Sequence, residues 1–432
     1  MSRTIQDVFA PDGLLATSIP GYRLRPQQLE MAERIAAAIA DNSVLVAEAG
    51  TGTGKTYAYL VPALLSGGKV IVSTGTKNLQ DQLFSKDIPT VRKVLGAPVQ
   101  VALLKGRANY LCHYHLERAL DDGRFVARED AAHAARIARF AKSTKTGDKA
   151  DCGDVPENST VWGMVTSTRE NCLGQDCPYN KECFVLAARR EALAADLVVV
   201  NHHLFFADVM LRDEGTAELL PACNTVIFDE AHQLPETASL FFGDNVSTAQ
   251  VIDLARDVRT EGITSAKDCL DLPKLCGVVE KAAKDLRLTL PVEPARFSLA
   301  QLEERGGFDN SLVGLIRELD VLTALLETQA QRSEGLENCW RRAGELVAQL
   351  RRWQKGADAN YVRWGETYTL SLQLNATPLV IASIMKKQMS GHPRAWIFTS
   401  ATLAVQRDFG HYCGEMGLEG AESAFWDSPF DY

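Results

Sequence analysis

Eight residues near the N-terminus constrain the fold of this chain more than any other segment. Positions 49–56 read A-G-T-G-T-G-K-T, which fits the pattern G-x-x-x-x-G-K-[ST] with Ala49 in place of the first glycine. The apolar run Ser43–Ala47 precedes them, and a helical pattern over Tyr57–Leu65 follows. A strand that turns through glycines into a helix presents main-chain N–H groups to an anion. The sequence therefore predicts a phosphate-binding loop on an α/β sheet.

The residues of this loop have expected roles in holding Mg²⁺–ATP. Lys55 would reach the β- and γ-phosphates, and the hydroxyl of Thr56 would bind Mg²⁺. The remaining positions would contribute main-chain N–H groups, and they are Gly50, Thr51, Gly52, Thr53 and Gly54. A glycine-rich turn without a ligand is the alternative interpretation of the same letters.

Strand and helix patterns alternate over the first third of the chain and return later, which is typical of a parallel sheet. The expected helices are Gln27–Ala40, Tyr57–Leu65 and Asn78–Phe84. The expected strands are Ser43–Ala47, Val70–Ser73, Leu197–Val200, Thr225–Phe228 and Trp396–Thr399. The pattern fails over Cys112–Cys183 and becomes mostly helical over Glu236–Arg363. We predict one sheet domain interrupted by two insertions.

An acidic tetrapeptide lies where such a sheet binds ligands. Asp229-Glu230-Ala231-His232 follows the strand Thr225–Phe228, at its carboxyl end. Asp229 is placed to hold Mg²⁺, and Glu230 to orient and deprotonate an attacking water. Two acids that begin a solvated helix are the alternative, and the phosphate loop in the same chain argues against it.

Composition and charge limit the class of protein. The chain has 432 residues, 46% of them hydrophobic and 23% charged, which fits a globular protein of two or three packed units. No apolar run is long enough to span a bilayer, and Met1–Gly13 lacks the apolar core of a signal peptide. We therefore expect a cytoplasmic protein without a membrane partner. A net charge of −9 excludes a surface that binds a polyanion everywhere, but not a local basic groove.

Four of the ten cysteines form a candidate metal site. Disulfides are not expected in the cytosol, and the four are Cys112, Cys172, Cys177 and Cys183. Four thiolates suit a 4Fe–4S cluster or structural zinc, and their spacing departs from the two close pairs typical of zinc. Cys152 is a rival for Cys112. Buried, inert thiols are expected for the other five cysteines, which are Cys223, Cys269, Cys276, Cys339 and Cys413. His202 and His203 are expected at a strand end on opposite faces, as structural or DNA-proximal residues.

With these motifs in place, the chain resembles the superfamily 2 helicases. The loop, the D-E-A-H box and Thr399-Ser400-Ala401-Thr402 are similar to motifs I, II and III of that superfamily. The resemblance implies that His232 belongs with Asp229 and Glu230 in the catalytic set. It also implies that Arg25 and Gln28 contact adenine, and that Ser73–Thr76 with Gln80 touches single-stranded DNA. Further candidates for the DNA path are Lys105 and Arg107, as contacts to phosphates, and Tyr110 or Tyr179, as stacking partners of bases. Solvated or packing side chains are the alternative for each of them.

The cysteines between loop and box, followed by D-L-V-V-V-N-H-H at 196–203, resemble the XPD/DinG group of iron–sulfur helicases and its YoaA-type branch. The resemblance implies a 4Fe–4S cluster on Cys112, Cys172, Cys177 and Cys183, and a helical arch after the box. The implied domains are a RecA-like motor in three segments, a cluster insert and an arch insert. The motor segments are 1–105, 191–235 and 366–432, the cluster insert is 106–190, and the arch is 236–365.

The resemblance implies an ATP-dependent 5′–3′ DNA helicase acting in repair or at replication forks, with single-stranded DNA and replication or repair proteins as partners. No Q-x-x-G-R-x-x-R helix occurs before Tyr432, so a second RecA-like domain is expected to be absent from residues 1–432. Alone they would then show little ATPase or unwinding. Two alternatives stay open at this point. One is a non-catalytic module that binds DNA or a partner and is switched by nucleotide. The other is a zinc-stabilised nucleotide-binding protein.

Overall fold

The computed structural model describes residues 3–123, 125, 127–213, 219–356, 361–378, 381–391 and 393–429. Residues 357–360 of the predicted arch and 430–432 of the last predicted motor segment lie outside this range. The chain forms two compact units. The sheet unit consists of residues 1–105, 187–241 and 380–432, and the insert unit of residues 106–186 and 242–379.

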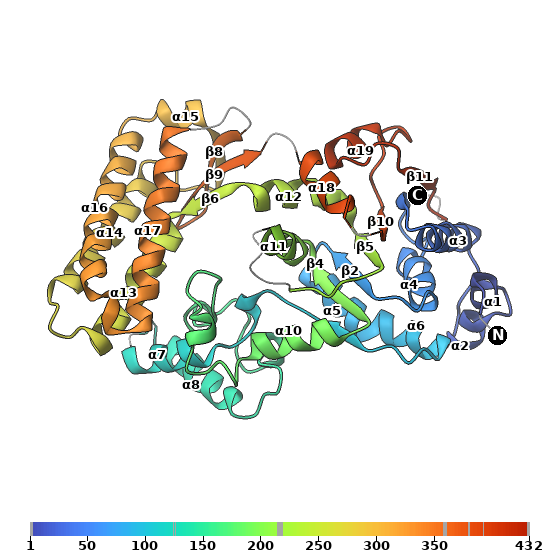
Figure 1. Cartoon of the computed structure of the whole chain (residues 1–432), viewed down its shortest axis with the longest axis horizontal. Helices are drawn as coiled ribbons and strands as arrows, with labels where there is room; N and C mark the ends of the chain where they lie inside the picture. The colour runs from blue at the N-terminus through green and yellow to red at the C-terminus, as the bar shows by residue number, and fades with distance from the viewer. Residues whose placement is uncertain are drawn as a thin grey trace. The chain divides into compact units, whose positions relative to one another are not determined.

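The sheet unit is built on seven strands, and each neighbouring pair runs parallel. Their order is β11 (Glu422–Trp426), β1 (Val44–Ala49), β10 (Ala395–Ser400), β5 (Thr225–Asp229), β2 (Val70–Thr74), β4 (Leu197–Asn201) and β3 (Val101–Leu103). Figure 1 shows β5 and β10, from distant parts of the sequence, side by side, and β1 pairs with the other edge of β10. Since the strands are parallel, their carboxyl ends meet at one edge. The predicted α/β fold and the predicted strands are confirmed.

Helices bury the apolar strands of this unit. α3 (Pro26–Ala40) starts with proline at its first turn, and α4 (Lys55–Leu65) packs against it. α5 (Lys77–Gln82) begins at Thr76, whose hydroxyl accepts the N–H of Leu79. It continues through a π-helical turn (Leu83–Asp87) into α6 (Ile88–Leu95). The predicted helix over Asn78–Phe84 is thus part of a longer one. The unit also contains α1 (Ile5–Phe9), α2 (Leu14–Ser18), α11 (His202–Asp213), α18 (Ala382–Met389) and α19 (Gly410–Met416).

The second insertion contains both helices and a sheet. The helices are α13 (Thr248–Ser265), α14 (Asp271–Leu288), α15 (Leu299–Glu303), α16 (Phe308–Gln329) and α17 (Glu334–Lys355). An antiparallel sheet accompanies them in the order β6 (Asp244–Ser247), β9 (Leu372–Pro378), β8 (Tyr361–Thr367) and β7 (Ala295–Ser298). The prediction of a mostly helical segment over Glu236–Arg363 missed this sheet. β6 and β7 are four residues each and too short to show a period, and the longer β8 and β9 lie mostly beyond Arg363.

The first insertion has a small core of its own. Short helices surround that core, and they are α7 (His113–Asp122), α8 (Arg128–Ala141) and α9 (Trp162–Val165). Ile137, Val161 and Trp162 are buried together there. α10 (Phe184–Ala194) and α12 (Leu234–Phe242) join the insertions to the sheet unit. Within the described residues, none of the helices combines the length and apolar character that a membrane crossing requires.

Candidate active site

The phosphate loop leaves β1 at the carboxyl edge of the sheet. Gly50 N–H donates to the carbonyl of Trp426 at 3.0 Å, and the Thr53 hydroxyl donates to the carbonyl of Gly50 at 2.8 Å. Gly54 has a φ of 86°, in the left-handed region that favours glycine. A Cβ on Gly54 would lie 2.1 Å from Nε2 of Gln28. The glycine therefore permits both the turn and the close approach of α3.

Two residues expected to contact adenine lie against this loop. Gln28 is 2% exposed, and its amide donates to the carbonyl of Gly54 at 2.9 Å while accepting from the hydroxyl of Tyr22 at 3.1 Å. A Cβ at Gly54 would also approach Nη1 of Arg25 at 3.4 Å. Gln28 thus fixes the loop, and Arg25 stands beside it just before α3.

Lys55 and Thr56 open α4, with half-buried side chains. Nζ of Lys55 donates to the carbonyl of Ala49 at 3.0 Å, so the ammonium group folds back over the loop. Tyr59 is fully buried one turn later. Burial raises the pKa of its hydroxyl, and the nearby Asp229 and Thr56 also affect that pKa. The cation and the hydroxyl expected to hold Mg²⁺–ATP are therefore side by side.

Asp229 ends β5 and is 6% exposed. Burial raises its pKa to about 7, the charge of Glu230 adds to the rise, and the charge of Lys55 opposes it. Glu230 has a φ of 56°, in the left-handed region that is uncommon for a residue with a side chain. The structure therefore places Lys55, Asp229 and Glu230 near one another at the carboxyl edge of the sheet.

The raised pKa of Asp229 gives the first prediction. Mg²⁺ binds an ionised carboxylate, and the carboxyl group without a cation is mostly protonated below about pH 7. The apparent Mg²⁺ affinity of the nucleotide complex should thus be constant above about pH 7 and fall by about tenfold per unit below it. Mg²⁺ titrations with a fluorescent ATP analogue measure this. Asp229→Asn is the control, because in this variant only the nucleotide itself still titrates. An identical pH dependence in both proteins contradicts the assignment of Asp229 as the titrating Mg²⁺ ligand.

His232 joins the acidic tetrapeptide to the T-S-A-T segment at the end of β10. Its Nδ1 lies 2.8 Å from Oγ of Ser400 and 3.4 Å from Oε2 of Glu230. Ser400 is fully buried and also accepts the N–H of Thr402 at 3.3 Å. The segment that follows β5 and carries Glu230 is therefore linked to the end of β10 by the contact between His232 and Ser400.

Sequence reasoning missed several residues of this edge. Glu48, in β1, accepts the N–H groups of Leu403 and Ala404, the latter at 2.6 Å. The sequence feature that could have indicated Glu48 is its position as a charged residue within the otherwise apolar strand β1. Tyr412 donates to the carbonyl of Ala231 at 2.9 Å, for which the sequence has no signal. His202 begins α11 rather than ending a strand, and it is 1% exposed.

Some expected DNA contacts are not available at the surface. Lys105 is 4% exposed and pairs with Asp81 at 2.8 Å, so its charge is used inside the sheet unit. Tyr110 is 4% exposed and cannot stack on a base, whereas Tyr179 is half-buried. Arg107 donates to Sγ of Cys172 at 3.1 Å. The expectations for Lys105 and Tyr110 are wrong, and Arg107 has a partner within the protein. The type of a residue does not show whether its side chain is buried.

The candidate ligand cysteines influence one another. Burial raises the pKa of Cys112 to about 12, and the charges of Cys177 and Cys172 add to the rise. Burial also raises the pKa of Cys177, to which Cys172 and Cys183 contribute. The structure thus gathers all four thiols in one region. Over the described ranges, no three or more His, Cys, Asp or Glu side chains are drawn together closely enough to enclose a metal ion.

The other cysteines are distributed through the two units. Cys152 packs in the apolar core of the first insertion, and its pKa is raised by burial and by Asp154. Buried thiols were expected for the rest, and this is confirmed for Cys276, Cys339 and Cys413. Cys223 and Cys269 are only partly buried, because they lie in loops at the edges of their cores.

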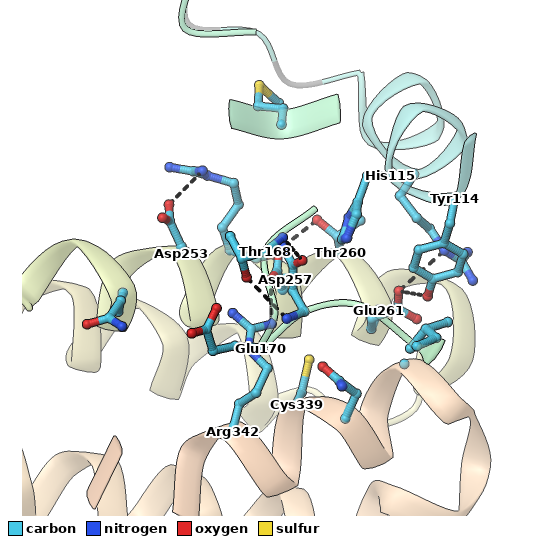
Figure 2. A pocket seen from close by; sticks show the side chains of 18 of the residues that line it. Tyr114, His115, Thr168, Glu170, Asp253, Asp257, Thr260, Glu261, Cys339 and Arg342 are labelled. Carbon is cyan, nitrogen blue, oxygen red and sulfur yellow. Dashed lines mark hydrogen bonds and ion pairs between the residues drawn. The ribbon is translucent and has the colours of Figure 1, made fainter. Parts of the chain in front are cut away.

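A charged pocket lies inside the insert unit, among α7, α13, α17 and the loop at 168–173. Figure 2 shows its ionic groups in pairs. Arg342 donates to Asp257 at 2.6 Å, and the hydroxyl of Tyr114 donates to Glu261, which also pairs with Arg118 at 3.3 Å. The two contacts of Glu261 hold α7 against α13, and the pair Arg342–Asp257 joins α17 to α13. None of the predicted site residues lines the pocket.

Comparison with known proteins places these features among helicases. A family model described as DEAD/DEAH box helicase matches residues 25–110. The chain is 43% identical to the ATP-dependent DNA helicase YoaA of Escherichia coli, over 99% of this chain and 67% of that protein. It is 41% identical to YoaA of Haemophilus influenzae, over 99% of this chain and 67% of the relative.

More distant relatives were also found. The chain is 33% identical to a protein of Bacillus subtilis named 3′-5′ exonuclease DinG, over 97% of this chain and 50% of that protein. Among solved structures, a truncated XPD is similar over 92% of this chain and 99% of that chain, at 14% identity and a TM-score of 0.44.

Proposed function

The chain belongs to the family of ATP-dependent helicases that includes YoaA and DinG, and we propose that it forms the ATP-binding motor part of a DNA helicase that acts in DNA repair. The observation that supports this most directly is the meeting of Lys55, Asp229 and Glu230 at the carboxyl edge of one parallel sheet. That edge is where open α/β sheets bind nucleotides.

The residues at this edge suit hydrolysis of Mg²⁺–ATP. Thr56 and Asp229 would hold Mg²⁺, which neutralises charge on the phosphates. Lys55 would leave the carbonyl of Ala49 for the β- and γ-phosphates, and Glu230 would accept a proton from the attacking water. The pair His232–Ser400 would carry the state of the site to the T-S-A-T segment.

For DNA we propose single strands as the substrate, with 5′–3′ movement. The segment Ser73–Thr76, at the end of β2, is the proposed contact to the strand. Replication or repair proteins are proposed partners. Gln80, which was also expected at the strand, is 1% exposed and its amide donates to the carbonyl of Leu104 at 3.4 Å, so we do not include it among the DNA contacts.

We also propose that Cys112, Cys172, Cys177 and Cys183 hold a 4Fe–4S cluster. Two features support the fit. The charges of Cys172 and Cys177 raise the pKa of Cys112, and those of Cys172 and Cys183 raise the pKa of Cys177. In addition, Sγ of Cys172 accepts hydrogen bonds from Arg107 at 3.1 Å and from the N–H of Gly174 at 3.5 Å. Hydrogen bonds to cluster sulfurs are a usual means of tuning such centres. When bound, the cluster would crosslink the first insertion.

The proposed function is tested by ATP turnover with and without single-stranded DNA, and by unwinding of duplexes that carry a 5′ or a 3′ tail. In a complete helicase that contains these residues we expect stimulation by single strands to about 1 s⁻¹ or faster, and unwinding from the 5′ tail. Residues 1–432 alone are expected to show little of either activity. Nucleotide-dependent DNA binding without turnover would instead support the non-catalytic switch. Unwinding only from the 3′ tail would contradict the proposed polarity while leaving the activity in place.

A further inference from the structure

A buried histidine lies between the proposed DNA-contacting segment and the proposed catalytic base. His202 is 1% exposed and follows β4, next to β2 in the sheet. Its Nδ1 lies 2.7 Å from Oγ of Ser73, which is fully buried at the end of β2. A polar contact enclosed in this way is worth more than one in water, and it fixes the imidazole relative to β2.

The other side of the same imidazole faces β5. Burial lowers the pKa of His202 to about 3. The main chain of Glu230, and to a smaller extent that of Asp229, raises this pKa. A main-chain group that raises the pKa of an imidazole is an acceptor, so carbonyl oxygens of this peptide stand near the ring. Since the ring is neutral, only one of its nitrogens carries a proton.

The contact to Glu230 is close but not completed. Nε2 of His202 is enclosed, and in the described part of the chain no group forms a hydrogen bond of ordinary geometry with it. When the Ser73 hydroxyl donates to Nδ1, Nε2 carries the proton, and a buried N–H without a partner is unfavourable. A small movement of the Glu230 carbonyl toward the ring would complete a hydrogen bond. Glu230 is also the residue whose backbone is in the left-handed region. The imidazole is therefore placed to affect the position of that peptide.

The arrangement mirrors the one on the other side of β5. β5, which ends at Asp229, lies between β10 and β2 in the sheet. Each of these two neighbours has a serine at or next to its carboxyl end, Ser400 in β10 and Ser73 in β2. His232 reaches Ser400 on β10, and His202 reaches Ser73 on β2. The sheet thus offers one histidine–serine contact toward the T-S-A-T segment and one toward Ser73–Thr76.

We propose that His202 is a positioning residue that couples the segment Ser73–Thr76 to the main chain of Glu230, so that binding of a single strand at β2 sets the base at the end of β5. The inference rests on the proposed helicase function and adds to it the route by which DNA stimulates hydrolysis. His203, the next residue, is exposed and takes no part.

Two substitutions each break one end of this bridge. In His202→Asn, the side-chain amide occupies the place of Nδ1 and keeps the contact to Ser73, but it is too short to reach Glu230. In His202→Gln, the longer side chain brings its amide to the place of Nε2 and loses the contact with the Ser73 hydroxyl. His203→Asn is the matched control. Turnover with and without single-stranded DNA, the KM for ATP, and Tm are measured in the full-length protein.

Both His202 variants should lose about tenfold or more of the stimulation by DNA, while turnover without DNA and the KM for ATP change by less than about threefold. The control should keep full stimulation. Retention of stimulation by either variant overturns the proposal, as does an equal fall of turnover with and without DNA alongside a lowered Tm, which would indicate a packing role. If the unsubstituted protein shows no stimulation, the proposed function itself fails, and that result is distinct.

Discussion

Glu230→Gln is expected to leave ATP binding intact and to slow hydrolysis by about 10² to 10⁴-fold. The amide has the shape of the carboxylate but cannot accept the proton of the attacking water. Neither Lys55 nor the loop main chain is altered, so the nucleotide should bind and persist. The left-handed backbone at Glu230 also permits Gln, because its barrier is steric and similar for both side chains.

The matching experiment compares single-turnover hydrolysis and equilibrium binding of ATP. Lys55→Ala serves as the contrast, because it removes the cation expected at the β- and γ-phosphates and should weaken binding together with turnover. Glu129→Gln, with a side chain 81% exposed in the first insertion, controls for loss of a charge. Normal hydrolysis in Glu230→Gln would mean that another group activates the water.

The nucleotide edge was predictable because its chemistry depends on local order in the sequence. A glycine loop between strand and helix, and acids directly after a strand, determine their own surroundings. The pair Gln28 and Gly54 was only partly foreseen: a role toward adenine was expected for Gln28, and the structure adds its contact with the loop. Glu48 and His202 act on residues more than a hundred positions away, and such contacts exist only in the folded chain.

The failures have the same origin. Lys105 and Tyr110 were expected at a DNA surface from residue type alone, but both side chains are buried, and Lys105 pairs with Asp81. The sheet β6–β9–β8–β7 joins segments from positions 244 to 378. A four-residue strand gains its stability from partners distant in sequence rather than from its own pattern.

Replacing any one of Cys112, Cys172, Cys177 and Cys183 by serine is expected to remove most of the iron from the protein. A 4Fe–4S cluster held by four thiolates would give about four iron atoms per chain and a brown protein. Serine is a poor ligand for iron in such a cluster, and the first insertion has only a small core around Ile137 and Trp162 to replace the lost crosslink. Iron analysis and the visible absorption spectrum of anaerobically purified protein measure the loss.

The controls follow from where the remaining cysteines lie. Cys339→Ser and Cys269→Ser belong to the second insertion, whose large helical core is separate from the four thiols, so both should keep their iron. Cys152→Ser tests the rival ligand directly, since Cys152 packs among apolar side chains with Asp154 as its nearest charge influence. Iron loss in Cys152→Ser with retention in Cys112→Ser would exchange these two residues in the ligand set. Zinc at about one atom per chain in place of iron would assign a structural zinc site instead, and the helicase proposal would stand, because Lys55, Asp229 and Glu230 do not depend on the metal.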